Sequence, residues 1–233
     1  MKMSGMHSTP ELARIGLLLR THGISQWGVA NNNPALPLAP HLPRAIALIA
    51  GFHPKSFVGL ENGPTEAYFS EYKRLNAMVN KAADALVRHL EKLGHSTAKV
   101  EATLEAYDKV EDWGDAGIFA HKTAATQAGL GWIGKTALFI STVFGPRVRL
   151  ATVFTNLELP TGTPITRGRC GRCRSCIEAC PVNAGRDVRW KAGIERQQLY
   201  NEKACEYFGD SFPELGGVCG ICIVACPIGE SRR

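Results

Sequence analysis

All eight cysteines of this 233-residue chain lie between positions 170 and 226, with spacings typical of metal ligands. The two runs are Cys170-x2-Cys173-x2-Cys176-x3-Cys180-Pro181 and Cys219-x2-Cys222-x3-Cys226-Pro227. The first run has the spacing of proteins that hold two [4Fe-4S] clusters. Three cysteines of a tight loop can reach three irons of one cubane, while the fourth points away toward the second cluster. We therefore predict two [4Fe-4S] clusters in the C-terminal third.

The second run is one ligand short. When the two runs are overlaid, Gly216 falls where the first cysteine of the motif would stand, and Cys205 is the only cysteine left. The interlocked motif then predicts two ligand sets, Cys170, Cys173, Cys176 and Cys226 for one cluster and Cys180, Cys205, Cys219 and Cys222 for the other. Structural zinc also uses Cys-x2-Cys pairs, but it needs neither the triplet nor the Cys-Pro endings.

The overall composition is that of an ordinary globular protein, with 45% hydrophobic and 21% charged residues. No apolar run approaches the ~20 residues that span a bilayer, and the early run over 15–19 is too short for a signal peptide. We therefore expect a cytoplasmic protein without a membrane segment, in which disulfides are improbable. The formal net charge is +6.

Basic residues surround the first cysteines. They either offset the negative charge of a thiolate-bound cluster, remain solvated, or form a docking face for an acidic partner or a phosphate backbone. The residues are Arg167, Arg169, Arg172 and Arg174.

Residues 1–163 are predicted to form an α/β domain, because helical and strand-like patterns alternate along them. The clearest helix spans 68–93, where apolar side chains recur every three or four positions, a stripe typical of core packing. Other expected elements are helices over 10–22 and 119–128 and strands over 27–30, 45–50, 96–101, 137–142 and 148–155.

Two turn-rich stretches divide the rest of the chain. Gly145-Pro146 lies between the last two expected strands, which could form a hairpin. The proline- and glycine-containing stretch 159–166 marks a boundary. Residues 164–233 would then be a small ferredoxin-like domain that binds both clusters.

One glycine-rich segment matches two patterns that are typical of nucleotide-binding sites. Gly129-Leu-Gly131-Trp132-Ile-Gly134-Lys135-Thr136 matches the P-loop pattern G-x-x-x-x-G-K-[ST] and contains G-x-G-x-x-G. Both motifs need a preceding strand and a following helix, whereas here a helical segment precedes and a strand-like segment follows. The pattern therefore does not favour nucleotide binding. The glycines instead allow close approach of the backbone, either to a cofactor or to neighbouring elements.

The segment from Ala128 to Lys135, followed by strands and the two cysteine runs, resembles the epoxyqueuosine reductase family. That family consists of cobalamin-dependent reductases with two [4Fe-4S] clusters, which act in queuosine synthesis in tRNA. The resemblance implies a nitroreductase-like α+β cofactor domain, an architecture shared with reductive dehalogenases. It also implies that Gly129, Gly131, Trp132 and Gly134 lie near a corrinoid.

The resemblance further assigns roles to three polar residues. Asp115 falls where the family has its proposed proton donor, although its glycine neighbours are also typical of a turn. His121 could donate a hydrogen bond to the cofactor or be an ordinary structural histidine. Lys135 could meet a corrinoid side chain or only solvent.

Two departures from the family bear on the substrate. Family members commonly continue into a helical-repeat extension that helps to hold tRNA, whereas seven residues follow Cys226 here, and the family's Asp-Tyr-His element is not evident. We therefore expect a short form in which tRNA binding is doubtful. The sequence predicts an iron–sulfur oxidoreductase with a redox partner protein, which passes electrons to a corrinoid and a substrate of unknown identity. The alternatives are an electron carrier, a reductive activator of a separate corrinoid protein, or a tRNA-binding protein.

Overall fold

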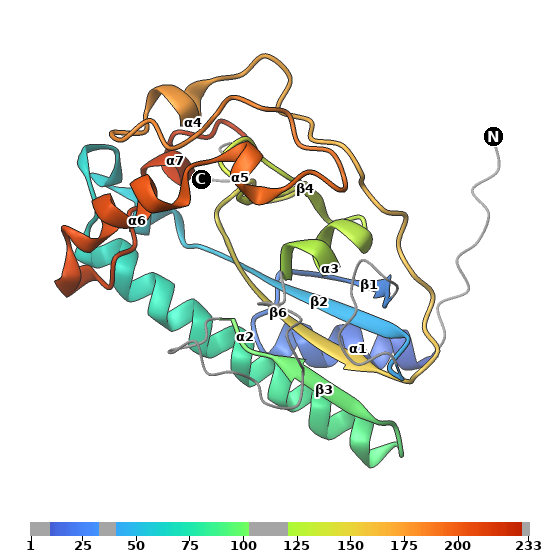
Figure 1. Cartoon of the computed structure of the whole chain (residues 1–233). Coiled ribbons are helices and arrows are strands. Elements are labelled where there is room, and N and C mark those ends of the chain that lie inside the picture. Colours follow the sequence, from blue (N-terminus) through green and yellow to red (C-terminus); the bar gives the residue numbers. More distant parts are fainter. Residues whose placement is uncertain (1–9, 33–40, 103–120, 230–233) are drawn as a thin grey trace.

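A four-stranded antiparallel sheet organises the computed structural model, which describes residues 10–32, 41–102 and 121–229. The strands are β1 (Gln26–Asn31), β2 (Arg44–Gly51), β3 (Thr97–Val100) and β6 (Val148–Thr155), in the order β1-β2-β6-β3. The chain is thus a mixed α/β protein (Figure 1). The apolar β2 is fully paired on both edges, to β1 and to β6, which explains its continuous hydrophobic sequence.

Two helices cover one face of this sheet. Helix α1 spans Pro10–Thr21 and helix α2 spans Glu66–Lys92. The Thr65 hydroxyl caps α2 by accepting a hydrogen bond from the Tyr68 amide. Alternate residues of β2 point into this layer, including Ile46 and Leu48, which pack with buried leucines of α2. Each fully buried leucine contributes roughly 2 kcal/mol by leaving water.

The opposite face carries α3 (His121–Gln127) and a separate two-stranded sheet of β4 (Gly131–Ile133) and β5 (Phe139–Ser141). The remaining side chains of β2, Ala45, Ala47 and Ile49, form a second core with this layer. A helix precedes the glycine-rich segment and strands follow it, as the sequence predicted, which is the reverse of a P-loop. No described helix is long and apolar enough to cross a bilayer.

One pairing differs from the expectation. The strand after Gly134 does not form a hairpin with β6, because the glycine-rich segment itself becomes strand β4 and pairs with β5 in register Trp132↔Ile140. Strand β6 pairs instead with β2 and β3. Gly131 makes the β4–β5 pairing possible, since a Cβ on it would collide with the carbonyl oxygen of Ile140.

The cysteine-containing segment wraps over α3, the β4–β5 hairpin and the first turns of α2 (Figure 1). Its elements are α4 (Ser175–Glu178), α5 (Arg196–Leu199), α6 (Glu202–Asp210), η4 (Pro213–Leu215) and α7 (Ile221–Val224). Two short helices before α2, η1 (Pro54–Phe57) and η2 (Leu60–Asn62), extend this contact. Buried Arg147 fixes the end of the segment by donating hydrogen bonds to the carbonyl oxygens of Val224, Cys226 and Ile228.

Candidate iron–sulfur cluster site

The fold gathers the first predicted ligand set into one pocket. Cys170, Cys173 and Cys176 line this pocket together with Cys226, which follows Cys176 by 50 positions in the sequence. Burial raises the pKa of Cys176 to about 11, and negative charge on the other three thiols adds to the rise. Electrostatic influence of this kind requires the four thiols to lie close together. The short helix α4 carries Cys176 inward, while Cys173 stays exposed at the surface.

The second predicted set gathers beside the first. Burial raises the pKa of Cys205, and charge on Cys219 and Cys180 contributes. Burial also raises the pKa of Cys222, with contributions from Cys219 and Cys205 and a weaker one from Cys176 of the first set. The two sets are therefore neighbours that meet at Cys176 and Cys222.

The absence of a cysteine ligand at position 216 has a structural cause. Gly216 adopts φ +62° at the end of η4, and a Cβ there would lie 2.6 Å from the ring of Phe69 on α2. A cysteine at this position would thus meet the core rather than a cluster. Helix α6 carries Cys205 instead, and Asn201 caps that helix by accepting a hydrogen bond from the Ala204 amide.

The spacing of the thiols suits clusters better than single ions. A zinc ion holds its four ligands within about 2.0–2.3 Å of one centre. In the described ranges, no three His, Cys, Asp or Glu side chains converge closely enough to hold one metal ion. A cubane instead takes one thiolate at each of four separate irons. The four thiols of the first set line a common pocket, which Cys222 of the second set also lines, and no carboxylate is among its lining residues, as that requirement needs.

The turn of the β4–β5 hairpin reaches into the first cysteine pocket. Gly134, Lys135 and Thr136 all line it. The side chain of Lys135 is only 4% exposed, and its ammonium group donates to the Cys173 carbonyl oxygen at 2.8 Å and to Asp187 Oδ1 at 2.6 Å. Lys135 therefore meets neither solvent nor an external ligand but binds the backbone of the cysteine loop.

The side chain of His121, which was predicted as a cofactor contact, forms hydrogen bonds within the chain. His121 Nδ1 lies 2.9 Å from the Thr152 hydroxyl, and Nε2 lies 2.8 Å from the carbonyl oxygen of Glu101. Only a protonated Nε2 can donate to that carbonyl, so Nδ1 accepts from Thr152 in the neutral ring. Burial lowers the pKa of His121 to about 4, which keeps the ring neutral at physiological pH.

The remaining predicted cofactor residues mostly contact their own chain. Gly129 has φ +75°, and a Cβ there would lie 2.5 Å from the Thr163 carbonyl oxygen. Gly134 packs on the Ile140 side chain. Trp132 is buried, and its Nε1 has no hydrogen-bond partner among the described residues. Asp115 lies outside the described residues. A corrinoid-binding role for these residues stays a prediction, and the described contacts of the glycines, Lys135 and His121 do not favour it.

Three residues that the sequence did not single out for the site lie at the cysteine segment or at the β4–β5 turn. Thr136 forms a side-chain hydrogen bond that opposes the raised pKa of Cys222. Lys122 donates to the Ala137 carbonyl oxygen at 2.8 Å, and burial lowers its pKa to about 8. Arg147 clamps the Cys226 end. Thr136 ended the P-loop-like pattern. For Lys122 and Arg147, the only sequence feature that could have indicated a role was a basic side chain near apolar residues.

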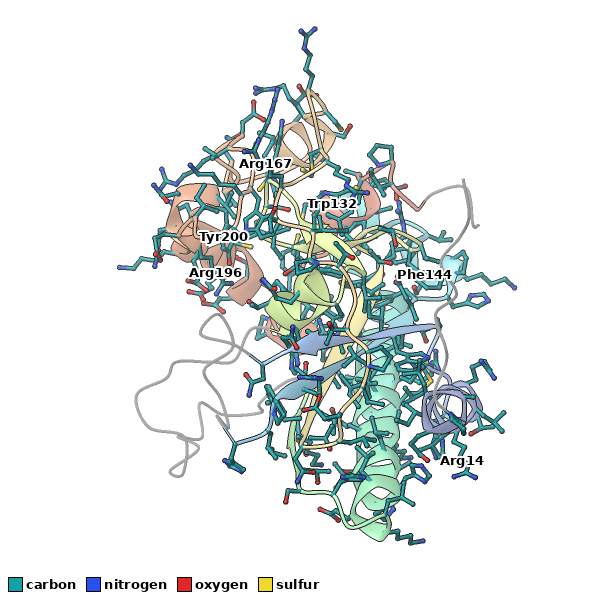
Figure 2. The ribbon with its side chains drawn as sticks, turned by 90° about the vertical axis from the view of Figure 1, so that its right-hand side faces the viewer. Arg14, Trp132, Phe144, Arg167, Arg196 and Tyr200 are labelled. Atoms are coloured by element: carbon teal, nitrogen blue, oxygen red, sulfur yellow. The ribbon has the colours of Figure 1, made fainter. Side chains whose placement is uncertain are left out.

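Exposed basic side chains cover the outer surface of the cysteine segment. In the described parts of the chain, seven of them form no ion pair: Arg167, Arg169, Arg172, Arg186, Arg189, Lys191 and Lys203. Arg169 lies over the Trp132 ring, 5.7 Å from its centroid. Figure 2 shows Arg167 and Trp132 at the end of the molecule opposite Arg14 of α1. These cations, in the same segment as the exposed Cys173, give the segment a positive surface.

Sequence comparison connects this arrangement to known proteins. No family model matches the chain. The epoxyqueuosine reductase of Aliivibrio fischeri is 30% identical over 220 residues, covering 88% of this chain and 56% of the relative. The tetrachloroethene reductive dehalogenase of Sulfurospirillum multivorans is 37% identical over 116 residues, covering 44% of this chain and 22% of that protein. The chain thus spans just over half and about a fifth of these relatives.

Solved structures share the fold. An epoxyqueuosine reductase solved with an epoxyqueuosine-modified tRNA-Tyr stem loop superposes with a TM-score of 0.61 at 17% identity, covering 94% of this chain and 65% of that one. A reductive dehalogenase described for B12-dependent dehalogenation superposes with a TM-score of 0.70 at 18% identity, covering 97% and 33%. With similarity to epoxyqueuosine reductase over most of its length and a fold shared with both groups of enzymes, this chain belongs to an epoxyqueuosine reductase-like family.

Proposed function

We propose that this protein is an iron–sulfur reductase in which residues 164–233 form a ferredoxin-like domain with two [4Fe-4S] clusters. The single observation that carries the proposal is the position of Cys226 in the same pocket as Cys170, Cys173 and Cys176. In the interlocked two-cluster motif, the last cysteine of each run binds the cluster of the other run, as this position of Cys226 allows. Bound clusters supply one-electron transfer. The chain's own contribution is to hold two thiol sets in contact, so that electrons cross a short distance inside the protein.

The two clusters need a group that accepts their electrons. We infer a corrinoid in the nitroreductase-like α/β domain, supported by the family and by the B12-dependent dehalogenase that shares the fold. Lys135 and His121 are engaged within the chain, so other residues would have to hold this group. That engagement favours the second candidate, an electron carrier or a reductive activator of a separate corrinoid protein.

A substrate proposal follows from the relatives, not from the described site. Reduction of a substrate needs a proton with the electrons, and Asp115 is the proposed donor, since a carboxylic acid whose pKa is raised can deliver one. The epoxyqueuosine reductase relative that was solved with a tRNA stem loop suggests a tRNA-derived substrate. The other candidate is a small molecule, as in the dehalogenases.

The positive surface suggests the electron donor. We propose an acidic redox protein that docks on this positive surface, because Cys173 of the first set is exposed in the same segment. Complementary charge would speed and orient such an encounter. A reducing compartment such as the cytoplasm fits this role, since the thiolate ligands must stay reduced.

Anaerobic purification with added cobalamin tests the proposal in two separable parts. Metal analysis should find about eight irons per chain and no zinc, as two four-iron clusters require. Zinc in place of iron would overturn the cluster assignment. Retained cobalt would establish the corrinoid reductase, whereas intact clusters without cobalt would favour the carrier or activator. Asp115→Asn should then abolish reduction of the substrate without changing the iron content.

A further inference from the structure

The Gly134-Lys135-Thr136 turn lines the first cysteine pocket, which Cys222 of the second set also lines. It connects β4 to β5, and two backbone hydrogen bonds close it, from the Gly134 amide to the Leu138 carbonyl at 2.7 Å and from the Ala137 amide to the Gly134 carbonyl at 3.1 Å. Lys122 also holds it through the Ala137 carbonyl oxygen. Neighbouring residues of this turn thus lie at different cysteines, with Lys135 at the carbonyl oxygen of Cys173 and Thr136 in the pocket lining that also includes Cys222.

Lys135 places an unusual charge beside the first cysteine set. Its ammonium group is nearly excluded from water, and lysine is rarely buried without a partner. Asp187 supplies a partner on one side and binds Arg174 on the other. Arg174 also pairs with Glu178, so the network holds two cations and two carboxylates, and Lys135 is the one of these four charges that is buried.

We propose that this turn sets the reduction potentials of the two clusters separately, with Lys135 raising that of the Cys170-Cys173-Cys176-Cys226 cluster and Thr136 that of its neighbour. A cluster becomes more negative when it gains an electron, so a buried cation stabilises its reduced form. A hydrogen bond to a ligand sulfur acts in the same direction and more weakly. The sequence that imitates a phosphate-binding loop is thus a control element for electron transfer.

This inference rests on the proposed function, because both clusters must be bound. The test is a redox titration followed by electron paramagnetic resonance on anaerobically purified full chain. Cys205→Ala and Cys226→Ser, each expected to lose one cluster, identify which signal belongs to which site. Iron content and circular dichroism of every variant show whether it has assembled and folded.

Three substitutions give a pattern that a merely structural role would not produce. Lys135→Gln should shift the reduction equilibrium of the first cluster at least tenfold toward the oxidised form, about 59 mV for one electron. Asp187→Asn should shift the same cluster in the opposite direction, because it removes a negative charge beside Lys135. Thr136→Val should shift only the second cluster, by about threefold toward the oxidised form.

Conservative variants serve as matched controls. Lys135→Arg and Thr136→Ser keep the charge and the hydroxyl, so both potentials should stay near those of the unmodified protein. If Lys135→Gln fails to assemble, Lys135→Met, which also removes the charge, takes its place, because Asp187→Asn would shift the potential through its own lost charge even without Lys135. Assembled Lys135→Gln and Asp187→Asn proteins that shift together, or not at all, would overturn the inference. Absence of clusters from the unmodified protein would instead refute the proposed function.

Discussion

The Nε2 atom of His121 lies 2.8 Å from the carbonyl oxygen of Glu101, a residue 20 positions earlier in the chain. The same ring accepts a hydrogen bond from Thr152 of β6. One neutral imidazole therefore joins the start of α3 to the end of β3 and to the central sheet. Burial, which lowers the pKa of His121 to about 4, makes this junction sensitive to acid.

The protein should lose stability as the pH falls from about 6.5 toward 4. The unfolded chain binds a proton at His121 near pH 6.5, whereas the folded chain resists protonation until about pH 4. The unfolded state therefore binds more protons across this window, and the contribution of His121, up to about 3 kcal/mol, is complete above it and lost within it. Anaerobic urea unfolding at pH 7.5, 6.5 and 5.5 measures the slope.

Two variants isolate the histidine from the carboxylates that also titrate in acid. His121→Gln should be less stable by about 1–3 kcal/mol at pH 7.5, since buried polar groups lose partners, and its slope between pH 7.5 and 5.5 should be shallower. His95→Gln is the control, because the His95 side chain makes no hydrogen bond among the described residues. Equal slopes for His121→Gln and the unmodified protein would contradict the assignment.

Exchange of single cysteines should remove clusters one at a time. Cys226→Ser should damage the cluster of Cys170, Cys173 and Cys176, although Cys226 belongs to the other sequence run. Cys205→Ala should damage the cluster of Cys180. Each variant should retain about four of about eight irons, measured by iron analysis with paramagnetic resonance to identify the surviving signal. Loss of both clusters to an equal extent in both variants would argue against the interlocked sets.

Gly131→Ala should disrupt the hairpin that presents Lys135. The added methyl group would collide with the Ile140 carbonyl oxygen of the paired strand, and backbone cannot yield as a flexible side chain can. The expected loss of unfolding free energy is about 2–3 kcal/mol, accompanied by loss of the first cluster. Gly94→Ala provides the comparison, because Gly94 has φ +83° but no atom within 4 Å of an added Cβ. It should cost about 1 kcal/mol and leave both clusters intact.

Charge reversal on the positive surface should slow electron delivery without changing the clusters. Arg172→Glu combined with Arg189→Glu should reduce the second-order rate with an acidic donor such as a flavodoxin at least tenfold at low salt, and the difference should shrink as salt is added. Stopped-flow reduction at several ionic strengths measures this. Arg20→Glu on α1 changes the net charge by the same amount per site and should have little effect. A salt-independent rate would remove the docking proposal.

Much of the fold could be predicted from local patterns. The stripe over 68–93 became α2 because apolar side chains at helical spacing face the sheet, and the continuous run over 45–50 became β2 because both faces of that strand are buried. The predicted family is confirmed by relatives that align over most of the chain. The strand pairing after Gly134 was predicted wrongly, because two short strands flanking Gly145-Pro146 resemble a hairpin locally. Their true partners depend on the Gly131 contact with Ile140, which no local pattern shows.

The sequence by itself determined the spacing of the cysteines and therefore the number of thiols available to each cluster. Residue type and spacing decide which metal centre a set of ligands can bind. Only the tertiary structure decided which side chains lie beside the cysteines. Lys135 was ambiguous in the sequence, since a lysine after a glycine can meet phosphate, a cofactor or solvent. Its ammonium group found Cys173 and Asp187, 38 and 52 positions away. Long-range burial of a charge depends on which segments meet, and that is settled by the packing of the whole chain.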